Sequence, residues 1–458
     1  MVKKILVYGL GIFFSKIIVF LLIPVYTRYF LPSDYGYYDV LISNLTMIVS
    51  ISFIEIWSGI IRFIFDDDRP YRPIKTFLIL LPALLVTYCI AFAILAQVME
   101  LKFPMLSVIY GIAYLLFTVF NNICRGLNHN IDYVVSGAVS SIFSCGLGIL
   151  FVVGLHRGIS SLMMAQIVGY LCAVVYVEIR TKALRMSIKE NIYLENVKEM
   201  FLYCIPLMVN SFSFLFLGTY NKNIVLYQLG ETASGYYAFV LKFTSILSIL
   251  ISIFSLAWQE VAFQNANSAE RDKMYSYYIN TFMKFIGLGI PLYCLLLYYF
   301  APIVGGTEYI LATQYIPLAV FGTFISEVSG VLGVVIAVSK RTFPILFSTI
   351  VGAIVNVSLV TWMTKAVGIN AASIGLCLGF FCVAVYRYFV GKKLIVIKMN
   401  IKYVALIFIE MLVTTGYFYL GNIVLFIALI LSLSITWWFV NIQEIKLVLH
   451  LVKNVCFR

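Results

Sequence analysis

Charged residues are scarce in this chain. Asp, Glu, Lys and Arg make up only 11% of its 458 residues, and 62% of the residues are hydrophobic. A soluble domain carries about 25% charged residues. The composition therefore excludes an ordinary soluble enzyme or binding domain and is typical of a polytopic membrane protein.

Metal-binding and nucleotide-binding motifs are missing as well. The three histidines lie far apart, and the nine cysteines are spread singly through apolar segments, with no Cys-x-x-Cys pair among them. The sequence also has no G-x-x-x-x-G-K-[ST] phosphate-binding loop. We therefore expect reduced, buried thiols, no metal site, no cofactor, and no ATP bound through such a loop.

Long polar connections are absent too, so the chain divides into apolar segments. A helix needs about 20 apolar residues to cross a bilayer. The first segment has the basic and apolar parts of a signal peptide but no clear small-x-small cleavage site, so we expect an uncleaved span. The sequence thus predicts an all-α membrane protein with about fourteen transmembrane helices, at residues 5–27, 38–64, 76–98, 104–124, 133–154, 159–179, 200–226, 236–263, 276–300, 309–338, 342–363, 369–390, 402–420 and 423–441.

The basic residues predict the orientation of these helices. With both termini and every even-to-odd connection on one side, the connections on the other side hold only Arg28, Lys102, Arg157 and Lys365. Lysine and arginine are enriched on the cytoplasmic side of membrane proteins, so both termini should be cytoplasmic. The net charge of +12 then reflects topology and anionic lipid headgroups, and not a nucleic-acid partner.

Two similar stretches indicate an internal repeat. A Gly-Tyr-Tyr sequence follows the first segment at Gly36 and the seventh at Gly235. Because the seventh segment enters the membrane in the same direction as the first, both stretches fall on the outer side, as in parallel repeats. We therefore predict two six-helix lobes around a central cleft, and expect the Gly-Tyr-Tyr itself to be architectural. The predicted divisions are an N-terminal lobe over 1–179, a basic amphipathic cytoplasmic connection over 180–199, a C-terminal lobe over 200–391, and two extra spans with a basic cytoplasmic tail over 392–458.

Ionisable residues inside apolar segments are the first candidates for function, because each costs about 2.5–3.5 kcal/mol to insert. Lys16 lies in the middle of the first segment, as either a functional cation or a structural tie between helices. In the second segment, Asn44, Glu55 and Arg62 fall on one face of a continuous helix, with Glu55 as the candidate partner of Lys16. Arg62 is alternatively a topogenic charge that reaches the headgroups.

The seventh and eighth segments carry a matching set of polar residues. Asn210 and Asn221 share one face of the seventh, with Lys222 next in the chain, and Lys242 and Glu260 share a face of the eighth. The first and second segments open the first repeat, and the seventh and eighth open the second. Polar residues on these four segments suit a cleft lined by both lobes. Its lysines favour an anionic substrate, since lysine suits a phosphate or pyrophosphate as a compact point charge.

Four stretches resemble the polysaccharide transporter branch of the multidrug/oligosaccharidyl-lipid/polysaccharide exporter superfamily. They are RYFLPSDYGYYDV from Arg28, NKNIVLYQLGETASGYYAFVLK from Asn221, AWQEVAFQ around Trp258, and VSKRTFPIL together with GINAASIG from Gly368. The family often has Asp-Arg where this chain has Asn221-Lys222, and often has proline where it has Glu260. The chain is most similar to O-antigen or capsule repeat-unit flippases, over most of its length.

The resemblance implies a flippase that carries an undecaprenyl-pyrophosphate-linked oligosaccharide from the inner to the outer leaflet of the cytoplasmic (inner) membrane by alternating access, for O-antigen or another surface polysaccharide. Its partners would be that lipid-linked substrate, membrane lipids, and glycan polymerase and chain-length proteins. The cations expected to bind pyrophosphate or stand at the mouths of the cleft are Lys16, Arg28, Arg62, Lys222 and Lys242. The polar residues expected to line the cleft or carry a coupling ion are Asn44, Glu55, Asn210, Asn221 and Glu260.

Three alternatives stay open. A peptidoglycan lipid-precursor flippase shares the chemistry. An ion-coupled exporter of cationic drugs would want an acidic cavity, whereas this one is basic. A membrane glycan polymerase or ligase would need acid/base groups in a sizeable outer loop, and the outer connections here are short and poor in His, Asp and Glu. A transporter is therefore expected, and not an enzyme.

Overall fold

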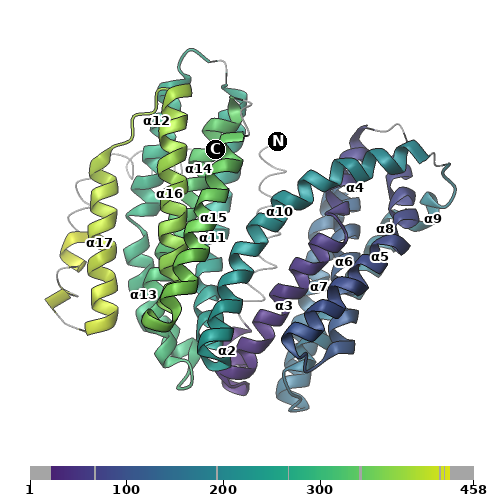
Figure 1. Ribbon diagram of the computed structural model, residues 1–458, viewed down its shortest axis with the longest axis horizontal. Helices are drawn as coiled ribbons and strands as arrows, with labels where there is room; N and C mark the ends of the chain where they lie inside the picture. The colour runs from purple at the N-terminus through teal and green to yellow at the C-terminus, as the bar shows by residue number, and fades with distance from the viewer. Residues whose placement is uncertain are drawn as a thin grey trace, which may run out of the picture. The chain divides into compact units, whose positions relative to one another are not determined.

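All regular secondary structure is helical in the part of the chain that the computed structural model describes, which comprises residues 22–66, 69–191, 194–266, 268–339, 343–421, 424–425, 427 and 429–433. The chain packs as two compact units, Met1–Leu226 and Tyr227–Arg458. Figure 1 shows the helices of each unit.

The helices of the first unit follow one another through short connections. They are α2 (Ile23–Tyr29), α3 (Pro32–Ser52), α4 (Ile56–Asp66), α5 (Arg72–Met99), α6 (Pro104–Gly126), α7 (Asn130–Ile149) with the π-helical turn η1 (Leu150–Gly154), α8 (Ser160–Thr181), α9 (Ala183–Ser187) and α10 (Leu194–Leu229). Proline stands at or next to the first position of α2, α3, α5 and α6, where its fixed φ suits a helix and its missing N–H is not needed.

The second unit continues from the end of α10. Its elements are α11 (Glu231–Gln264), α12 (Arg271–Phe282) with the π-helical turn η2 (Met283–Gly287), α13 (Ile290–Gly305), the 3₁₀ helix η3 (Ile310–Tyr315), α14 (Ile316–Val338), α15 (Phe343–Val367), α16 (Asn370–Leu394) and α17 (Ile401–Leu420).

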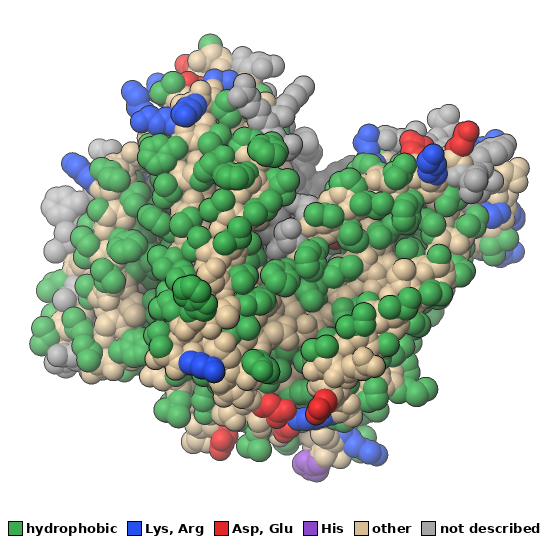
Figure 2. Space-filling model, in the orientation of Figure 1, with side chains coloured by type: hydrophobic (Ala, Val, Ile, Leu, Met, Phe, Trp, Pro, Cys, Tyr) green, Lys and Arg blue, Asp and Glu red, His purple; other side chains and the backbone are tan. Residues whose placement is uncertain are grey.

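The described helices are those of a multi-pass membrane protein. Ten helical stretches are long and apolar enough to cross a membrane, and the bent pair α3 and α4 would be an eleventh. Figure 2 shows hydrophobic side chains over the flanks of the helices and most charged side chains near their ends. Large apolar side chains stand outward, and Trp362 is 83% exposed. Such a surface suits lipid as the surrounding solvent.

These stretches correspond to eleven of the fourteen segments predicted from the sequence. The predicted seventh segment is covered by α10, a 36-residue helix outside that set. The first and last predicted segments, 5–27 and 423–441, lie largely outside the described residues. The all-helical, membrane-spanning prediction is therefore confirmed, with ten or eleven candidate spans among the described residues; the full count of fourteen stays a prediction.

The two Gly-Tyr-Tyr sequences occupy the same place in their helices. Gly36 lies four residues after Pro32, the first residue of α3, and Gly235 lies four residues after Glu231, the first residue of α11. The next residue in each case contacts an equivalent connection. The Tyr37 hydroxyl accepts a 2.8 Å hydrogen bond from the backbone N–H of Lys102, between α5 and α6. The ring of Tyr236 packs edge-on against Tyr309, between α13 and α14, at 6.3 Å.

The two units also share an order of packing. In the first unit α7 packs along α8, α6 packs on α8, and α4 packs on α6. In the second unit α15 packs along α16, α14 packs on α16, and α11 packs on α14. Counted from the start of each predicted repeat, these are the same three helix pairs. The predicted residue boundaries of the two lobes stay a prediction.

Small residues allow the closest of these helix pairs to form. A Cβ placed on Gly169 of α8 would lie only 2.6 Å from the backbone oxygen of Ser140 in α7. In the second unit, a Cβ on Gly379 of α16 would lie 2.8 Å from the backbone oxygen of Gly352 in α15. Backbone atoms cannot move aside as a flexible side chain can, so both crossings require glycine.

Replacing Gly169 by leucine should therefore force α7 and α8 apart. Overpacking of this kind typically costs about 1–3 kcal/mol, and a backbone clash places the change at the upper end of that range. The matched control is Gly146→Leu in α7, because a Cβ at Gly146 meets nothing within 4 Å. Thermal melting of the purified protein in detergent should fall for Gly169→Leu alone. Equal melting temperatures in the two variants would contradict the proposed crossing.

Candidate functional site

A largely buried ion pair joins α3 and α10 within the first unit. The ammonium nitrogen of Lys222 lies 2.6 Å from Oδ2 of Asp39 and donates a 2.7 Å hydrogen bond to the Ser43 hydroxyl. The side chain of Lys222 is 18% exposed and that of Asp39 is 12% exposed. Asp39 and Ser43 lie one helical turn apart on α3, so both face the same stretch of α10.

A pair of amides lies beside this ion pair. Asn44 and Asn223 exchange two hydrogen bonds, from each Nδ2 to the other's Oδ1, and both measure 3.0 Å. Each amide also donates to its own helix, Asn44 to the carbonyl of Val40 at 3.0 Å and Asn223 to the carbonyl of Thr219 at 2.9 Å. The ion pair and the amide pair together form a polar cluster of Asp39, Ser43, Asn44, Lys222 and Asn223, named below the α3–α10 cluster.

Electrostatics makes the α3–α10 cluster a candidate for function, because a charge on a largely buried side chain has to be balanced. A buried ion is costly unless it is paired and hydrogen-bonded. Lys222 is held by one carboxylate and one hydroxyl. An anion that approached it would compete with Asp39 for the same ammonium group. The cluster can thus hold a cation in readiness for an anionic group.

The sequence prediction found two of these five residues. Lys222 and Asn44 were expected at the site, and the structure brings both into one cluster. Asp39, Ser43 and Asn223 were missed. The signal was present, because Asp39 follows the Gly-Tyr-Tyr directly and stands four and five residues before Ser43 and Asn44. Asn221, expected on the cleft-facing side of α10, is fully buried.

The remaining predicted residues of the first unit lie apart from the cluster. Arg28 is exposed in the last turn of α2, and Arg62 is exposed on α4. Glu55 accepts a 3.0 Å hydrogen bond from the Ser58 hydroxyl. Lys16 lies outside the described residues, so its pairing with Glu55 stays a prediction.

The continuous polar face expected for the second predicted segment is wrong in one respect. That face assumed a single helix over 38–64, whereas α3 ends at Ser52 and α4 begins at Ile56 with a bend of 50° between them. The rule of 100° per residue does not apply across such a break. Asn44 and Arg62 therefore belong to different helices.

In the second unit, Lys242 lies partly buried on α11, seven residues after Gly235. Ser43 stands seven residues after Gly36 in α3. Lys242 thus occupies the position in α11 that Ser43, a contact of Lys222, occupies in α3. The backbones of Asn210 and Glu260 belong to α10 and α11, but their side chains lie outside the described part of the structure.

A buried arginine was missed altogether, because its place near the end of a predicted segment suggested a cytoplasmic charge. Arg387 of α16 is only 6% exposed. Its guanidinium donates to the Ser348 hydroxyl at 2.9 Å, the Thr349 hydroxyl at 3.0 Å and the carbonyl of Ser329 at 2.8 Å. These acceptors come from α14 and α15, so Arg387 joins three helices of the second unit.

No potential metal site appears in the described residues, where no three His, Cys, Asp or Glu side chains gather. The eight described cysteines are all unpaired thiols. The α3–α10 cluster therefore offers largely buried cationic and amide groups. Such groups can bind and release an anionic or polar molecule.

Comparison with known proteins identifies the family. Residues 1–259, more than half of the chain, match the family described as "Polysaccharide biosynthesis protein". The chain belongs to this family. No curated protein matches the chain significantly.

Solved structures show which fold the family member adopts. The lipid II flippase MurJ in its inward closed conformation superposes with a TM-score of 0.71 at 13% identity, over 97% of this chain and 100% of that one. An inward-facing MATE-family multidrug transporter gives 0.70 at 15% identity, over 82% and 94%. A point mutant of the Vibrio cholerae MATE transporter VcmN gives 0.57 at 11% identity, over 85% and 96%.

The fold is thus the multi-pass helical fold shared by MATE and MurJ. Together with the family match, it makes this chain a multi-pass membrane protein of the polysaccharide biosynthesis protein family.

Proposed function

We propose that this protein is a transporter, a flippase for an undecaprenyl-pyrophosphate-linked oligosaccharide, which it carries from the inner to the outer leaflet of the cytoplasmic membrane by alternating access. The repeat unit would serve O-antigen or another surface polysaccharide. The observation that carries the proposal is Lys222, a largely buried ammonium group that is balanced by Asp39 and donates to Ser43.

The chemistry of the cluster fits a pyrophosphate linked to a sugar. Lysine binds phosphate oxygens as a compact point charge, and amide groups exchange hydrogen bonds with hydroxyl and amide groups of sugars. Lys222 supplies the first kind of contact, and Asn44 with Asn223 supplies the second one residue away. In the proposed cycle, pyrophosphate displaces Asp39 from Lys222 and is released when Asp39 returns.

Lys242 extends the proposed cationic path into the second unit. Its place in α11 corresponds to that of Ser43 in α3. If the two units are repeats, Lys242 is therefore the residue of the second repeat that is equivalent to Ser43 of the α3–α10 cluster. Lys16 completes the proposed set of cations, with Arg28 and Arg62 at the two mouths. Glu55 and Glu260 are proposed to orient these cations or to carry a coupling ion.

We further propose the complete arrangement of about fourteen transmembrane helices, with two parallel six-helix repeats, two C-terminal spans and cytoplasmic termini. The matching Gly-Tyr-Tyr positions and the shared packing order of the two units support the repeats. The glycan polymerase and chain-length proteins of the same process are the proposed protein partners.

Deletion of the gene tests the proposed function directly. We expect loss of the surface polysaccharide, with lipid-linked repeat units retained on the cytoplasmic face of the membrane. The measurement is the accessibility of the lipid-linked units to a membrane-impermeant glycan-modifying reagent in right-side-out and inverted vesicles. Unpolymerised units found on the outer face would instead indicate a polymerase, and the flippase proposal would fail.

A further inference from the structure

The break between α3 and α4 is strained. Ile54 has φ +46° and Glu55 has φ +55°, so two successive residues adopt the left-handed conformation. Neither is glycine, and each left-handed L-residue costs roughly 1–2 kcal/mol. For a β-branched residue such as Ile54, a positive φ is an outlier.

The local sequence does not require this break. Helix kinks usually occur at proline or glycine, and neither is present between Ile48 and Trp57. The stretch is apolar and compatible with a continuous helix across the second predicted segment. Strained backbone of this kind persists only where the surrounding structure holds it, and it is concentrated at functional sites and switches.

Contacts from a neighbouring helix hold the broken form. In a continuous helix the carbonyl of Ser52 would accept the N–H of Ile56. In this structure the hydroxyl of Thr87, on α5, donates to the Ser52 carbonyl at 2.8 Å, and the N–H of Ile56 bonds to the carbonyl of Phe53 at 2.9 Å. The same hydroxyl lies 2.8 Å from the carbonyl of Leu84 in its own helix, so its single proton is shared between two acceptors and replaces the missing helical hydrogen bond in part.

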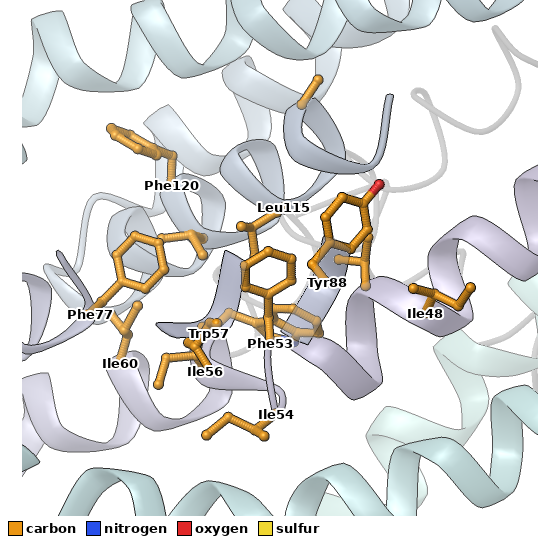
Figure 3. Packing of buried hydrophobic residues seen from close by; sticks show 14 of the residues in the cluster. Ile48, Phe53, Ile54, Ile56, Trp57, Ile60, Phe77, Tyr88, Leu115 and Phe120 are labelled. Carbon is orange, nitrogen blue, oxygen red and sulfur yellow. The ribbon is translucent and has the colours of Figure 1, made fainter. Parts of the chain in front are cut away.

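Both sides of the break are anchored in the apolar core of the first unit. Phe53 and Ile56 are completely buried. Figure 3 shows Phe53 directed toward Leu115 and Tyr88, while Ile54 points to the opposite side. The rings of Phe53 and Tyr88 lie 5.5 Å apart. Two well-packed helices thus meet at a short strained joint, and the strain is confined to Ile54 and Glu55.

We propose that this joint is a conformational switch. In the second form, the turn over 53–55 becomes helical, α3 and α4 join into one nearly straight helix, and the Ser52 carbonyl exchanges Thr87 for Ile56. The left-handed strain disappears in that form, whereas the contacts of α4 in the present core are lost. The relief of backbone strain favours the straight form and the core contacts of α4 favour the bent form. Because these two free-energy contributions oppose each other, both forms can be populated. The purpose of the switch rests on the proposed flippase function, in which the two forms would belong to different steps of alternating access.

A matched pair of substitutions tests the switch at Glu55, which is partly exposed. Glu55→Gly and Glu55→Ala both remove the carboxylate, but only glycine accepts a positive φ without strain, and alanine favours a continuous helix. We expect glycine to shift the population about tenfold toward the bent form, and alanine to shift it toward the straight form. Thr87→Val, which keeps the shape and removes the hydroxyl, should act in the same direction as Glu55→Ala.

The bend can be measured without any substrate. Spin labels at Leu31 and Phe65, both more than half exposed, report the distance across α3 and α4 in full-length protein in lipid nanodiscs, with the native cysteines replaced. Straightening the 50° bend lengthens that distance by about 4 Å, from a rise of 1.5 Å per residue. Identical distance distributions in wild type, Glu55→Gly, Glu55→Ala and Thr87→Val would overturn the switch.

The same variants separate the switch from the proposed function. In vesicles that contain a fluorescent polyprenyl-pyrophosphate-linked disaccharide, Thr87→Val, which keeps Glu55, should flip the probe about fivefold more slowly than wild type, because it populates one form too strongly. The Glu55 variants also lose a carboxylate of the proposed transport path, so they serve for the distance measurement. If distances respond to the substitutions while wild type flips no probe, the switch stands and the flippase proposal fails. If wild type flips the probe and no distance changes, the switch alone fails.

Discussion

Replacing Lys222 by alanine is expected to reduce flipping by about a hundredfold or more, and to destabilise the protein. The loss of flipping follows from removal of the cation proposed to bind pyrophosphate. The loss of stability has another cause, because Asp39 keeps its charge without its ion pair to Lys222. Breaking a buried pair by removing one partner costs about 3–5 kcal/mol. The measurements are thermal melting in detergent and flipping in reconstituted vesicles.

The double variant Asp39→Asn/Lys222→Met separates these two effects. It removes both charges together, so no buried charge is left unbalanced and the melting temperature should return near to the wild-type value. Flipping should stay lost, because the cation is still absent. Lys365→Ala, at an exposed position in the last turn of α15, is the control that should leave both properties unchanged. Wild-type flipping in the double variant would exclude Lys222 from substrate binding.

The fold could largely be predicted from the sequence because the hydrocarbon core of a bilayer imposes simple rules on the chain. An apolar segment of sufficient length becomes a membrane-spanning helix, since backbone groups must be satisfied within the segment. The repeat could also be predicted, because the Gly-Tyr-Tyr sequence that marks it stands at the same helical position in α3 and α11. These features depend on local composition and on order along the chain.

The break in the second predicted segment could not be predicted from the sequence, because no residue type at Phe53, Ile54 or Glu55 indicates it. The contacts at the break come from elsewhere in the chain, such as Thr87, more than thirty residues further along, whose hydroxyl donates to the Ser52 carbonyl. Strain maintained by tertiary contacts leaves no local signal. The prediction of one continuous polar face over Asn44, Glu55 and Arg62 failed for this reason.

The α3–α10 cluster could be predicted in part from the sequence. The rarity of charge in apolar segments pointed to Lys222, and helical spacing pointed to Asn44 as a polar residue of α3. The partners of these residues depend on which face of α10 meets α3, and that is decided by packing. Asp39 and Asn223 could therefore be recognised only when the two helices were seen together. Arg387 shows the same limit, since its burial depends on three helices of the second unit.

A membrane potential should drive the proposed transport strongly. Moving an anion out of an inside-negative compartment is favoured by about 2.3 kcal/mol per charge per 100 mV. A pyrophosphate diester carries two charges, so 100 mV corresponds to about 4.6 kcal/mol, or roughly a 2,000-fold change in the equilibrium ratio between leaflets. Proteoliposomes with a fluorescent polyprenyl-pyrophosphate-linked disaccharide, a valinomycin-imposed potassium potential and an impermeant quencher measure that ratio. The protein's orientation in the vesicle does not change an equilibrium, so mixed orientations are acceptable.

The charge dependence of this response is the decisive control. A polyprenyl-monophosphate-linked analogue carries one charge fewer and should respond with half the free energy, about 2.3 kcal/mol or roughly fiftyfold at 100 mV. If Lys222 binds the pyrophosphate, Lys222→Ala vesicles should show neither response within the time that wild type needs to reach equilibrium. A ratio that ignores the potential but follows an imposed proton or sodium gradient would contradict transport driven by the membrane potential. Glu55 and Glu260 would then be the acids to replace first, because both are proposed to carry a coupling ion.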